Sequence, residues 1–144
     1  VTRRQRQMCI RDRRNTSKSD IALAALKSIC FQTRDLFECL LKDTALNRNK
    51  FSLRVDGGMS KNNLMMQFLS NILQVKIERP VNQESTAVGA AYLAGIQSGM
   101  YKGVADVEKL WKTDRTFEPT ISLDQADQEY DEWLKTIKGL IDNG

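Results

Sequence analysis

The sequence predicts an α/β fold in which helices pack on an incomplete sheet, and three observations support this. Two short segments, residues 51–55 and 75–79, alternate apolar and polar residues as half-buried strands do. Segments whose apolar residues recur at helical spacing lie before, between and after these two strands. The order helix–strand–helix–strand–helix–helix favours parallel strands with right-handed crossovers. Two strands are too few for a complete sheet of this kind, so we expect the chain to form part of a domain.

The first helix is predicted from about residue 19 to residue 41, with Ser19 or Asp20 as its cap. Its apolar residues recur at spacings of three and four, which is the period of a helix with one buried face. A break in this helix is expected near residues 32–34. The helix carries Cys30 and Cys39, which we expect to be small core residues.

The remaining elements follow from the same patterns of spacing, capping and turn residues. Ser60 is expected to open the second helix, Pro80 to close the second strand, and Asp124 to precede the last helix. The elements are a loop at 42–50, a strand at 51–55, a helix from 60 to about 73, a strand at 75–79, a helix at 84–98, a short helical segment at 107–111 and a last helix ending near 141.

Composition limits the classes of protein to which the chain can belong. Its 144 residues predict about one domain, and 28% charged with 41% hydrophobic residues is typical of a soluble globular protein. The uncharged stretch at 85–101 is too short and too polar to span a bilayer, and no signal peptide is expected. Cys30 and Cys39 lie nine residues apart on opposite faces of one helix, so they cannot form a disulfide. Because the chain has no histidine, we do not expect a zinc site. The number and spacing of the cysteines favour a cytoplasmic protein.

The net charge of +4 belongs to the first residues of the chain. Val1–Arg14 holds six arginines and one aspartate, which leaves 16 basic and 17 acidic residues in the rest. An arginine-rich arm for nucleic acid and a terminus without a role are two interpretations. A third is favoured, because Met8–Arg13 resembles the translation of the transposase mosaic-end adapter used in sequencing-library preparation. We therefore treat residues 1–14 as a non-native tail and 15–144 as the domain, expect no nucleic-acid partner, and expect the native N-terminal portion to be missing.

The turn Asp56-Gly57-Gly58 is the feature that points to chemistry. Two glycines at the carboxyl end of a parallel strand let a ligand touch the backbone without interference from a Cβ atom. The following helix offers N–H groups and a positive dipole end to an anion, and the polar residues 60–63 are expected within reach of the same place. The carboxyl edge of an α/β sheet is also where ligands usually bind. The pattern alone leaves two interpretations, nucleotide binding or a turn whose glycines serve only geometry.

The helix predicted at 84–98 carries a stripe of small residues at helical spacing. The stripe consists of Ala87, Ala90, Ala91, Ala94 and Ser98. Such a stripe lets another helix approach closely, at a contact that can slide or act as a hinge. The alternative is an ordinary alanine-rich helix favoured by its intrinsic propensity.

Several segments together resemble the FGGY carbohydrate kinases, which belong to the superfamily of actin, hexokinase and heat-shock-chaperone ATPases. The likeness is closest to the members that phosphorylate glycerol, because other sugar kinases usually keep the glycines without the Asp-Gly-Gly plus Asn-Asn combination. It runs from about residue 15 to the last helix. The segments are Leu53–Asn63, Glu78-Arg79-Pro80 and Glu84–Gly95, with additional likeness at 30–35 and Phe117-Glu118-Pro119.

The resemblance implies a partial ribonuclease H-like or actin-like ATPase domain, the C-terminal half of the second domain of such a kinase. It implies ATP and Mg²⁺ as cofactors, ADP as product, and glycerol bound through the missing N-terminal part. By resemblance, Gly58 and Asn62 contact the adenine nucleotide, Gly57 supports the same turn, and the helix at 84–98 is the second interdomain connector. A homo-oligomer of the complete enzyme is compatible with this expectation.

The family's phosphate loops, substrate-binding residues and catalytic aspartate all precede the region matched here. No catalytic residue and no Mg²⁺ ligand can therefore be placed on this sequence, and we expect the chain alone to be inactive. Other interpretations stay open: another sugar kinase of the family, an actin-like or chaperone-like ATPase module, or a nucleic-acid-binding domain if the basic tail is native. The joint presence of Asn62-Asn63 and the Glu84–Ala87 segment favours the kinase.

Overall fold

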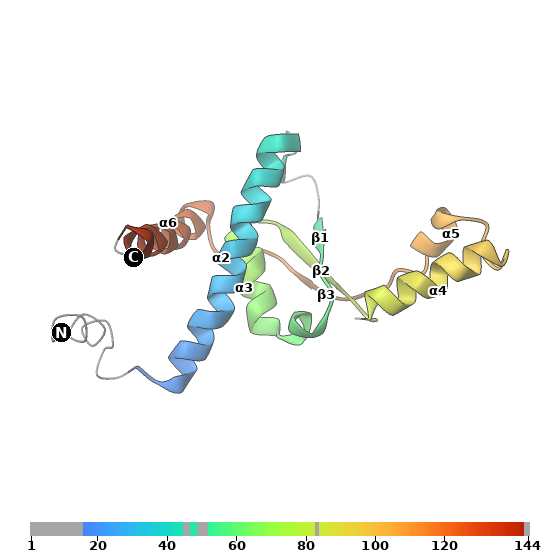
Figure 1. Cartoon of the computed structure of the whole chain (residues 1–144), viewed down its shortest axis with the longest axis horizontal. Helices are drawn as coiled ribbons and strands as arrows, with labels where there is room; N and C mark the ends of the chain where they lie inside the picture. The colour runs from blue at the N-terminus through green and yellow to red at the C-terminus, as the bar shows by residue number, and fades with distance from the viewer. Residues whose placement is uncertain (1–15, 45–46, 49–51, 83, 143–144) are drawn as a thin grey trace.

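The computed structural model describes residues 16–44, 47–48, 52–82 and 84–142. Residues 1–14, interpreted from the sequence as a non-native tail, lie outside the described residues. Figure 1 shows α2 crossing in front of α3 and the sheet, with α6 on one side and α4 and α5 on the other. The elements in chain order are α2 (Lys18–Thr44), β1 (Ser52–Arg54), the 3-10 helix η2 (Gly58–Lys61), α3 (Asn63–Leu73), β2 (Lys76–Pro80), α4 (Ser85–Gln97), α5 (Val104–Glu108), β3 (Thr113–Phe117) and α6 (Leu123–Ile141).

The sheet has the strand order β1-β2-β3 in the described part of the chain. The predicted parallel pair is confirmed, since Leu53 of β1 is the partner of Ile77 of β2. The expectation of two strands is wrong, because β3 pairs antiparallel with β2. The first four residues of β3 are exposed and polar, and only Phe117 is buried, so this edge strand lacks the alternation that identifies a strand. The short helix expected at 107–111 forms earlier, at Val104–Glu108.

Helix α2 is continuous over 27 residues, so the predicted break near 32–34 is wrong. Its buried face continues through this region with Phe31, Arg34 and Phe37, which leaves no reason for the helix to end there. The cap also lies earlier than expected. The Ser17 hydroxyl accepts a hydrogen bond from the Asp20 N–H at 3.2 Å, and the Asp20 carboxylate accepts one from the Ser17 N–H at 2.8 Å.

The hydrophobic core lies between α2, α3 and the sheet. Leu73 and Ile77 are completely buried there, together with Cys30. Burial raises the pKa of the Cys30 thiol to about 11. Cys39 is exposed, so the expectation that both cysteines are core residues is wrong for Cys39. The nine-residue spacing places it on the opposite side of the helix.

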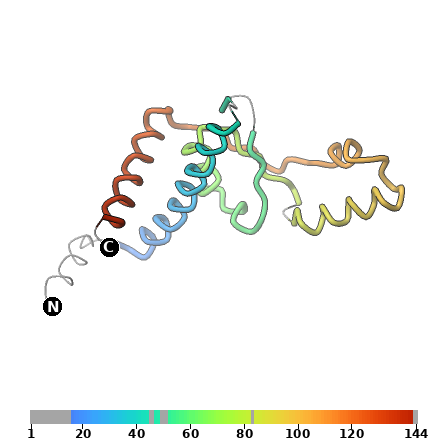
Figure 2. The backbone as a smooth tube through the Cα atoms, turned by 45° about the horizontal axis from the view of Figure 1, so that its top comes forward, coloured from blue at the N-terminus to red at the C-terminus, as the bar shows by residue number. Residues whose placement is uncertain are grey.

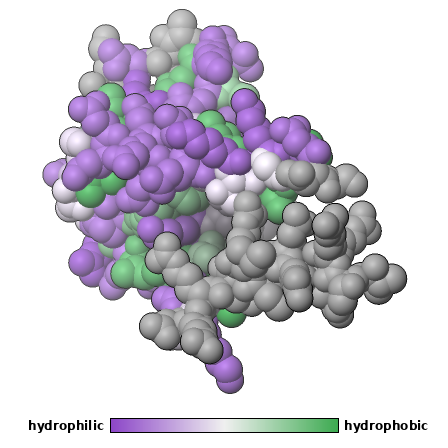
Figure 3. Space-filling view, turned by 90° about the vertical axis from the view of Figure 1, so that its left-hand side faces the viewer, coloured by the Kyte–Doolittle hydropathy of each residue, from purple (hydrophilic) through white to green (hydrophobic). Residues whose placement is uncertain are grey.

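Helix α6 packs along α2, as the tube in Figure 2 shows. The Arg34 guanidinium, on α2, pairs with Asp127 and donates to the Ala126 carbonyl at 3.0 Å. The Tyr130 hydroxyl donates to the Asp35 carboxylate. The face that carries α6 is largely hydrophilic where Figure 3 shows described residues. These polar contacts, together with the stacking of Phe31 on Trp133 at 5.4 Å, attach α6 to α2.

Helices α4 and α5 extend away from the sheet as an arm (Figure 1). Tyr101 packs against Gly95 so closely that a Cβ atom there would lie 2.7 Å from its ring, and it also meets Tyr92 edge to face. The small residues of the predicted stripe on α4 are exposed. Among the described residues, no helix is long and apolar enough to cross a membrane.

Candidate functional site

The turn after β1 is built around Gly57, whose backbone φ is 81° and ψ is 173°. Residues with a side chain rarely adopt a positive φ, so this position requires glycine. The Gly57 carbonyl accepts from the Ser60 N–H at 3.1 Å and from the Ser60 hydroxyl at 2.7 Å. These bonds turn the chain from the sheet into η2. We call residues 57–62 the glycine turn.

Gly58 presents its backbone to open space. A Cβ atom built on Gly58 would meet no atom within 4 Å in the described chain beyond its two neighbours in sequence, and the residue is exposed. Its φ lies outside the left-handed region, so the fold itself does not require glycine there. The described residues would therefore admit a side chain at Gly58, and its open backbone can be approached by a ligand or by another part of the protein.

Asn62 ends the glycine turn and caps α3. Its side-chain oxygen accepts a hydrogen bond from the Met65 N–H at 3.2 Å, while its own N–H donates to the Met59 carbonyl at 3.1 Å. The residue is exposed. Because the side-chain oxygen serves the cap, the amide nitrogen is the part of this side chain directed to other partners. An exposed donor beside an open glycine is suited to a polar ligand.

Two polar residues expected beside a ligand have structural roles instead. Ser60 is 1% exposed and uses its hydroxyl on the Gly57 carbonyl, so the expectation that it reaches a ligand is wrong. Asn63 uses its side-chain oxygen to accept from Arg79 at 2.9 Å. Of the predicted polar residues 60–63, Lys61 and Asn62 keep exposed side chains that are not consumed in these contacts.

Arg79 is a component of the site that sequence reasoning missed. It lies on β2 and is 8% exposed, and its guanidinium donates to the Ser60 carbonyl at 2.8 Å. Asp114 of β3 pairs with the same guanidinium at 2.7 Å. The triplet Glu78-Arg79-Pro80 was part of the family likeness, but it indicated no role for Arg79 because β3 was not predicted.

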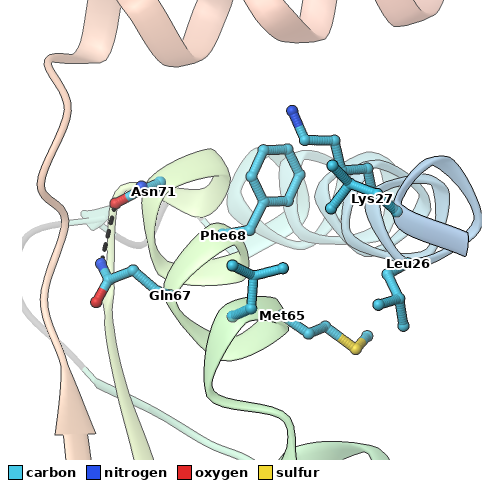
Figure 4. A pocket seen from close by; sticks show the side chains of 8 residues that line it. Leu26, Lys27, Met65, Gln67, Phe68 and Asn71 are labelled. Carbon is cyan, nitrogen blue, oxygen red and sulfur yellow. Dashed lines mark hydrogen bonds between the residues drawn. The ribbon is translucent and has the colours of Figure 1, made fainter. Parts of the chain in front are cut away.

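A separate apolar groove lies between α2 and α3 (Figure 4). Lys27 extends over the ring of Phe68 at 4.5 Å, and Gln67 donates to Asn71 at 3.2 Å on the other flank. The groove is lined by helix side chains only and includes no residue of the glycine turn. Its lining is mostly apolar, and Lys27, Gln67 and Asn71 are its polar side chains.

No group of three His, Cys, Asp or Glu side chains in the described parts of the chain is arranged to hold a metal ion. The glycine turn can recognise a ligand through its backbone, the amide of Asn62 and the ammonium group of Lys61.

The chain matches one known protein family over about two thirds of its length. Residues 3–98 match the model of the FGGY family of carbohydrate kinases, C-terminal domain. The chain belongs to the FGGY carbohydrate kinase family. The match includes most of residues 1–14, so it does not separate the proposed tail from the domain.

Relatives within the FGGY family share this region closely. The chain is 47% identical over 124 residues to a glycerol kinase of Marinomonas sp. and 43% identical to one of Alteromonas mediterranea. Each alignment covers 86% of this chain and 24% of the relative. The chain thus spans about a quarter of the length of the curated relatives it matches.

Solved structures confirm the predicted fold class. A glycerol kinase of Plasmodium falciparum, solved with ADP, matches with a TM-score of 0.77 and 32% identity, over 88% of this chain and 25% of that one. A gluconate kinase of Lactobacillus acidophilus matches with a TM-score of 0.69 and 22% identity, over 90% of this chain and 26% of that one. The incomplete sheet with its packed helices is therefore part of the actin-like ATPase fold of the FGGY kinases.

Proposed function

We propose that this chain is the C-terminal part of an ATP-dependent glycerol kinase. The complete enzyme transfers the γ-phosphoryl group of ATP to a terminal hydroxyl of glycerol and releases ADP and glycerol 3-phosphate. The part formed by this chain supplies a wall of the adenine-nucleotide site. Gly58 and Asn62 contact the nucleotide, and Gly57 holds the turn that carries them.

One observation supports the nucleotide site most strongly, namely the open space at Gly58. Gly57 is needed by the turn itself, because its φ is positive. Gly58 has neither a positive φ nor a close neighbour, which is also true of the helical Gly89 and Gly139. Of these three glycines, Gly58 is the one that follows a parallel strand, where α/β proteins bind ligands. Ligand approach to the backbone accounts for a glycine here.

Glycerol is favoured as substrate over other sugars by the pattern of identities. The relatives named glycerol kinase share 41–47% of their aligned residues with this chain. The gluconate kinase and the xylulose kinase of Lactobacillus acidophilus each share 22% and support the fold alone. The residues that bind glycerol are expected in the part of the kinase outside this chain.

The chain's contribution to phosphoryl transfer is positioning. Such reactions depend on holding the phosphates and the attacking oxygen in line, and on stabilising charge that develops on the transferred group. Mg²⁺, when bound, neutralises part of that charge. The glycine turn fixes the adenosine end of ATP, and the exposed small residues of α4 provide the connector along which the two domains close.

The domain organisation is part of the proposal. Residues 15–144 form the C-terminal portion of the nucleotide-binding domain, and residues 1–14 are adapter-derived. Sequencing the gene from unamplified genomic DNA tests this, with a longer upstream reading frame expected in place of the Met-Cys-Ile-Arg-Asp-Arg codons. Recovery of those codons would refute the adapter origin. We expect the enzyme in the cytoplasm.

The function is tested with the complete reading frame, expressed and purified. ATP-dependent phosphorylation of glycerol is expected, well above that of gluconate or xylulose. Purified residues 15–144 are expected to show no activity above a mock preparation, because positioning groups without the reacting groups lose most catalysis. A complete enzyme that prefers xylulose or gluconate would shift the assignment to another sugar kinase of the family.

A further inference from the structure

Arg79 holds the two residues that flank Asn62. Its Nη1 donates to the side-chain oxygen of Asn63 at 2.9 Å and approaches the Lys61 carbonyl at 3.4 Å. The same nitrogen donates to the Ser60 carbonyl at 2.8 Å. Carbonyls in the last turn of a helix have no partner within it, and a guanidinium with five donors can satisfy several at once. Asn62 is thus held through its neighbours, while its own side chain stays exposed.

Asp114 fixes the orientation of this guanidinium. Its Oδ2 accepts from Arg79 Nε at 2.8 Å and lies 2.7 Å from Nη2. The guanidinium is planar and rigid, so anchoring its Nε and Nη2 on Asp114 directs Nη1 toward the glycine turn. Asp114 lies on β3, next to an irregularity in the β2–β3 pairing between Arg79 and Pro80.

We propose that Arg79 is a positioning residue for the adenine nucleotide, and that Asp114 orients it. This inference rests on the proposed function, because it assigns Arg79 to the nucleotide site. Arg79 does not contact the ligand in this role. It fixes the carbonyls of η2 and the start of α3, and so sets the distance between Gly58 and the side-chain amide of Asn62.

Arg115 offers a matched control on the same sheet. Its guanidinium lies over the ring of Phe117 at 5.1 Å, as that of Arg79 does at 5.6 Å. Arg115 is exposed and lies opposite Arg79 in the pairing of β3 with β2. A substitution at Arg115 therefore removes a comparable contact with the same ring and keeps the hydrogen bonds of Arg79 to Ser60 and Asn63.

The test compares Arg79→Met, Arg79→Lys, Asp114→Asn and Arg115→Met in the complete kinase that carries this chain. ADP binding is measured by calorimetry, and the KM values for ATP and glycerol by steady-state kinetics, well below the melting temperature. Arg79→Met is expected to weaken ADP binding and raise the KM for ATP about tenfold, with the KM for glycerol little changed. Arg79→Lys, with one point charge, is expected to restore only part of the loss.

The controls separate this inference from the proposed function. Arg115→Met is expected to bind ADP as the unsubstituted enzyme does, and Asp114→Asn to lose less than Arg79→Met. If Arg79→Met fails to fold, the exposed Asn63→Ala variant removes one acceptor of the clamp and is expected to show the same selective loss for ATP. Unchanged ADP affinity in folded Arg79→Met would overturn the role of Arg79 and leave the proposed function intact. If Arg79→Met does not fold, unchanged ADP affinity in Asn63→Ala has the same meaning. An unsubstituted enzyme that binds ADP but does not phosphorylate glycerol would overturn the substrate assignment alone.

Discussion

The side-chain oxygen of Asn62 accepts a hydrogen bond from the backbone N–H of Met65 at 3.2 Å and so caps α3. This bond divides the functions of one amide group between its two ends. The oxygen stabilises the helix, and the nitrogen is the end that we propose contacts the nucleotide. Fold and function can therefore be separated at this residue by substitutions that keep one end and remove the other.

Three substitutions of Asn62 make this separation measurable. Asn62→Ala removes both ends, and we expect the free energy of unfolding to fall by about 1 kcal/mol and nucleotide affinity to fall about fivefold. Asn62→Ser and Asn62→Asp keep a capping oxygen, so stability should stay close to that of the unsubstituted protein while affinity falls as in Asn62→Ala. Urea unfolding and ADP titration on the same preparations provide both readouts. Full nucleotide affinity in folded Asn62→Ser would assign Asn62 to the cap alone.

The two glycines of the turn should respond in opposite ways to a side chain. Gly57→Ala is expected to destabilise the protein by about 1 kcal/mol or more, because its φ of 81° disfavours any residue with a Cβ atom. Gly58→Ala and Gly58→Val should change stability little, since the new atoms point into open space. Gly58→Val should nevertheless raise the KM for ATP far more than the KM for glycerol, because its branched side chain occupies the nucleotide's place. Thermal melts and steady-state kinetics distinguish the two outcomes, and unaltered ATP binding in folded Gly58→Val removes Gly58 from the site.

The sequence predicted those parts of the site that depend on neighbours in the chain. The glycine turn follows a strand with clear alternation at Leu53 and Val55, and the apolar stripes of α3 have helical spacing. Asn62 was assigned to the nucleotide by likeness, although an asparagine before an apolar run also signals a cap. The role of Arg79 could not be predicted, because it depends on pairing with Asp114 across a strand that has no hydrophobic pattern. Contacts between residues far apart in sequence become visible only once the sheet order is known.

The buried thiol of Cys30 should make stability depend on pH in the alkaline range. Burial raises its pKa from 9.0 to about 11, so the folded protein keeps the thiol neutral where the unfolded chain ionises it. The stabilisation is complete below about pH 9 and is lost as pH rises toward 11, by up to about 1.4 kcal/mol per pH unit. Urea unfolding at pH 8, 9, 10 and 11 should show this component in the unsubstituted protein and in Cys39→Ala, and not in Cys30→Ala. An identical pH profile for Cys30→Ala would contradict it.

The same two thiols should differ in reactivity. Cys39 is exposed on α2, whereas Cys30 is completely buried and has a raised pKa. Because the thiolate is the reactive form, iodoacetamide at pH 8 should modify Cys39 in the folded protein and leave Cys30 unmodified until urea is added. Peptide mapping by mass spectrometry measures both sites in one sample. Equal modification of both residues without urea would show that α2 opens readily from the core.

Ser70 should be a sensitive polar residue of the core. It is completely buried, and its hydroxyl lies 2.8 Å from the Val75 carbonyl and 3.1 Å from the Phe117 carbonyl, so it joins α3 to the segments that begin β2 and end β3. Ser70→Ala leaves both carbonyls without this donor, and we expect the free energy of unfolding to fall by about 1–3 kcal/mol. Ser98→Ala is the matched control, because the exposed Ser98 makes one hydroxyl bond, to the Gly95 carbonyl at 3.1 Å, and its loss should cost less than about 0.5 kcal/mol. Urea midpoints of the two variants test the difference, and equal midpoints would mean that β3 is held by its pairing with β2 without help from α3.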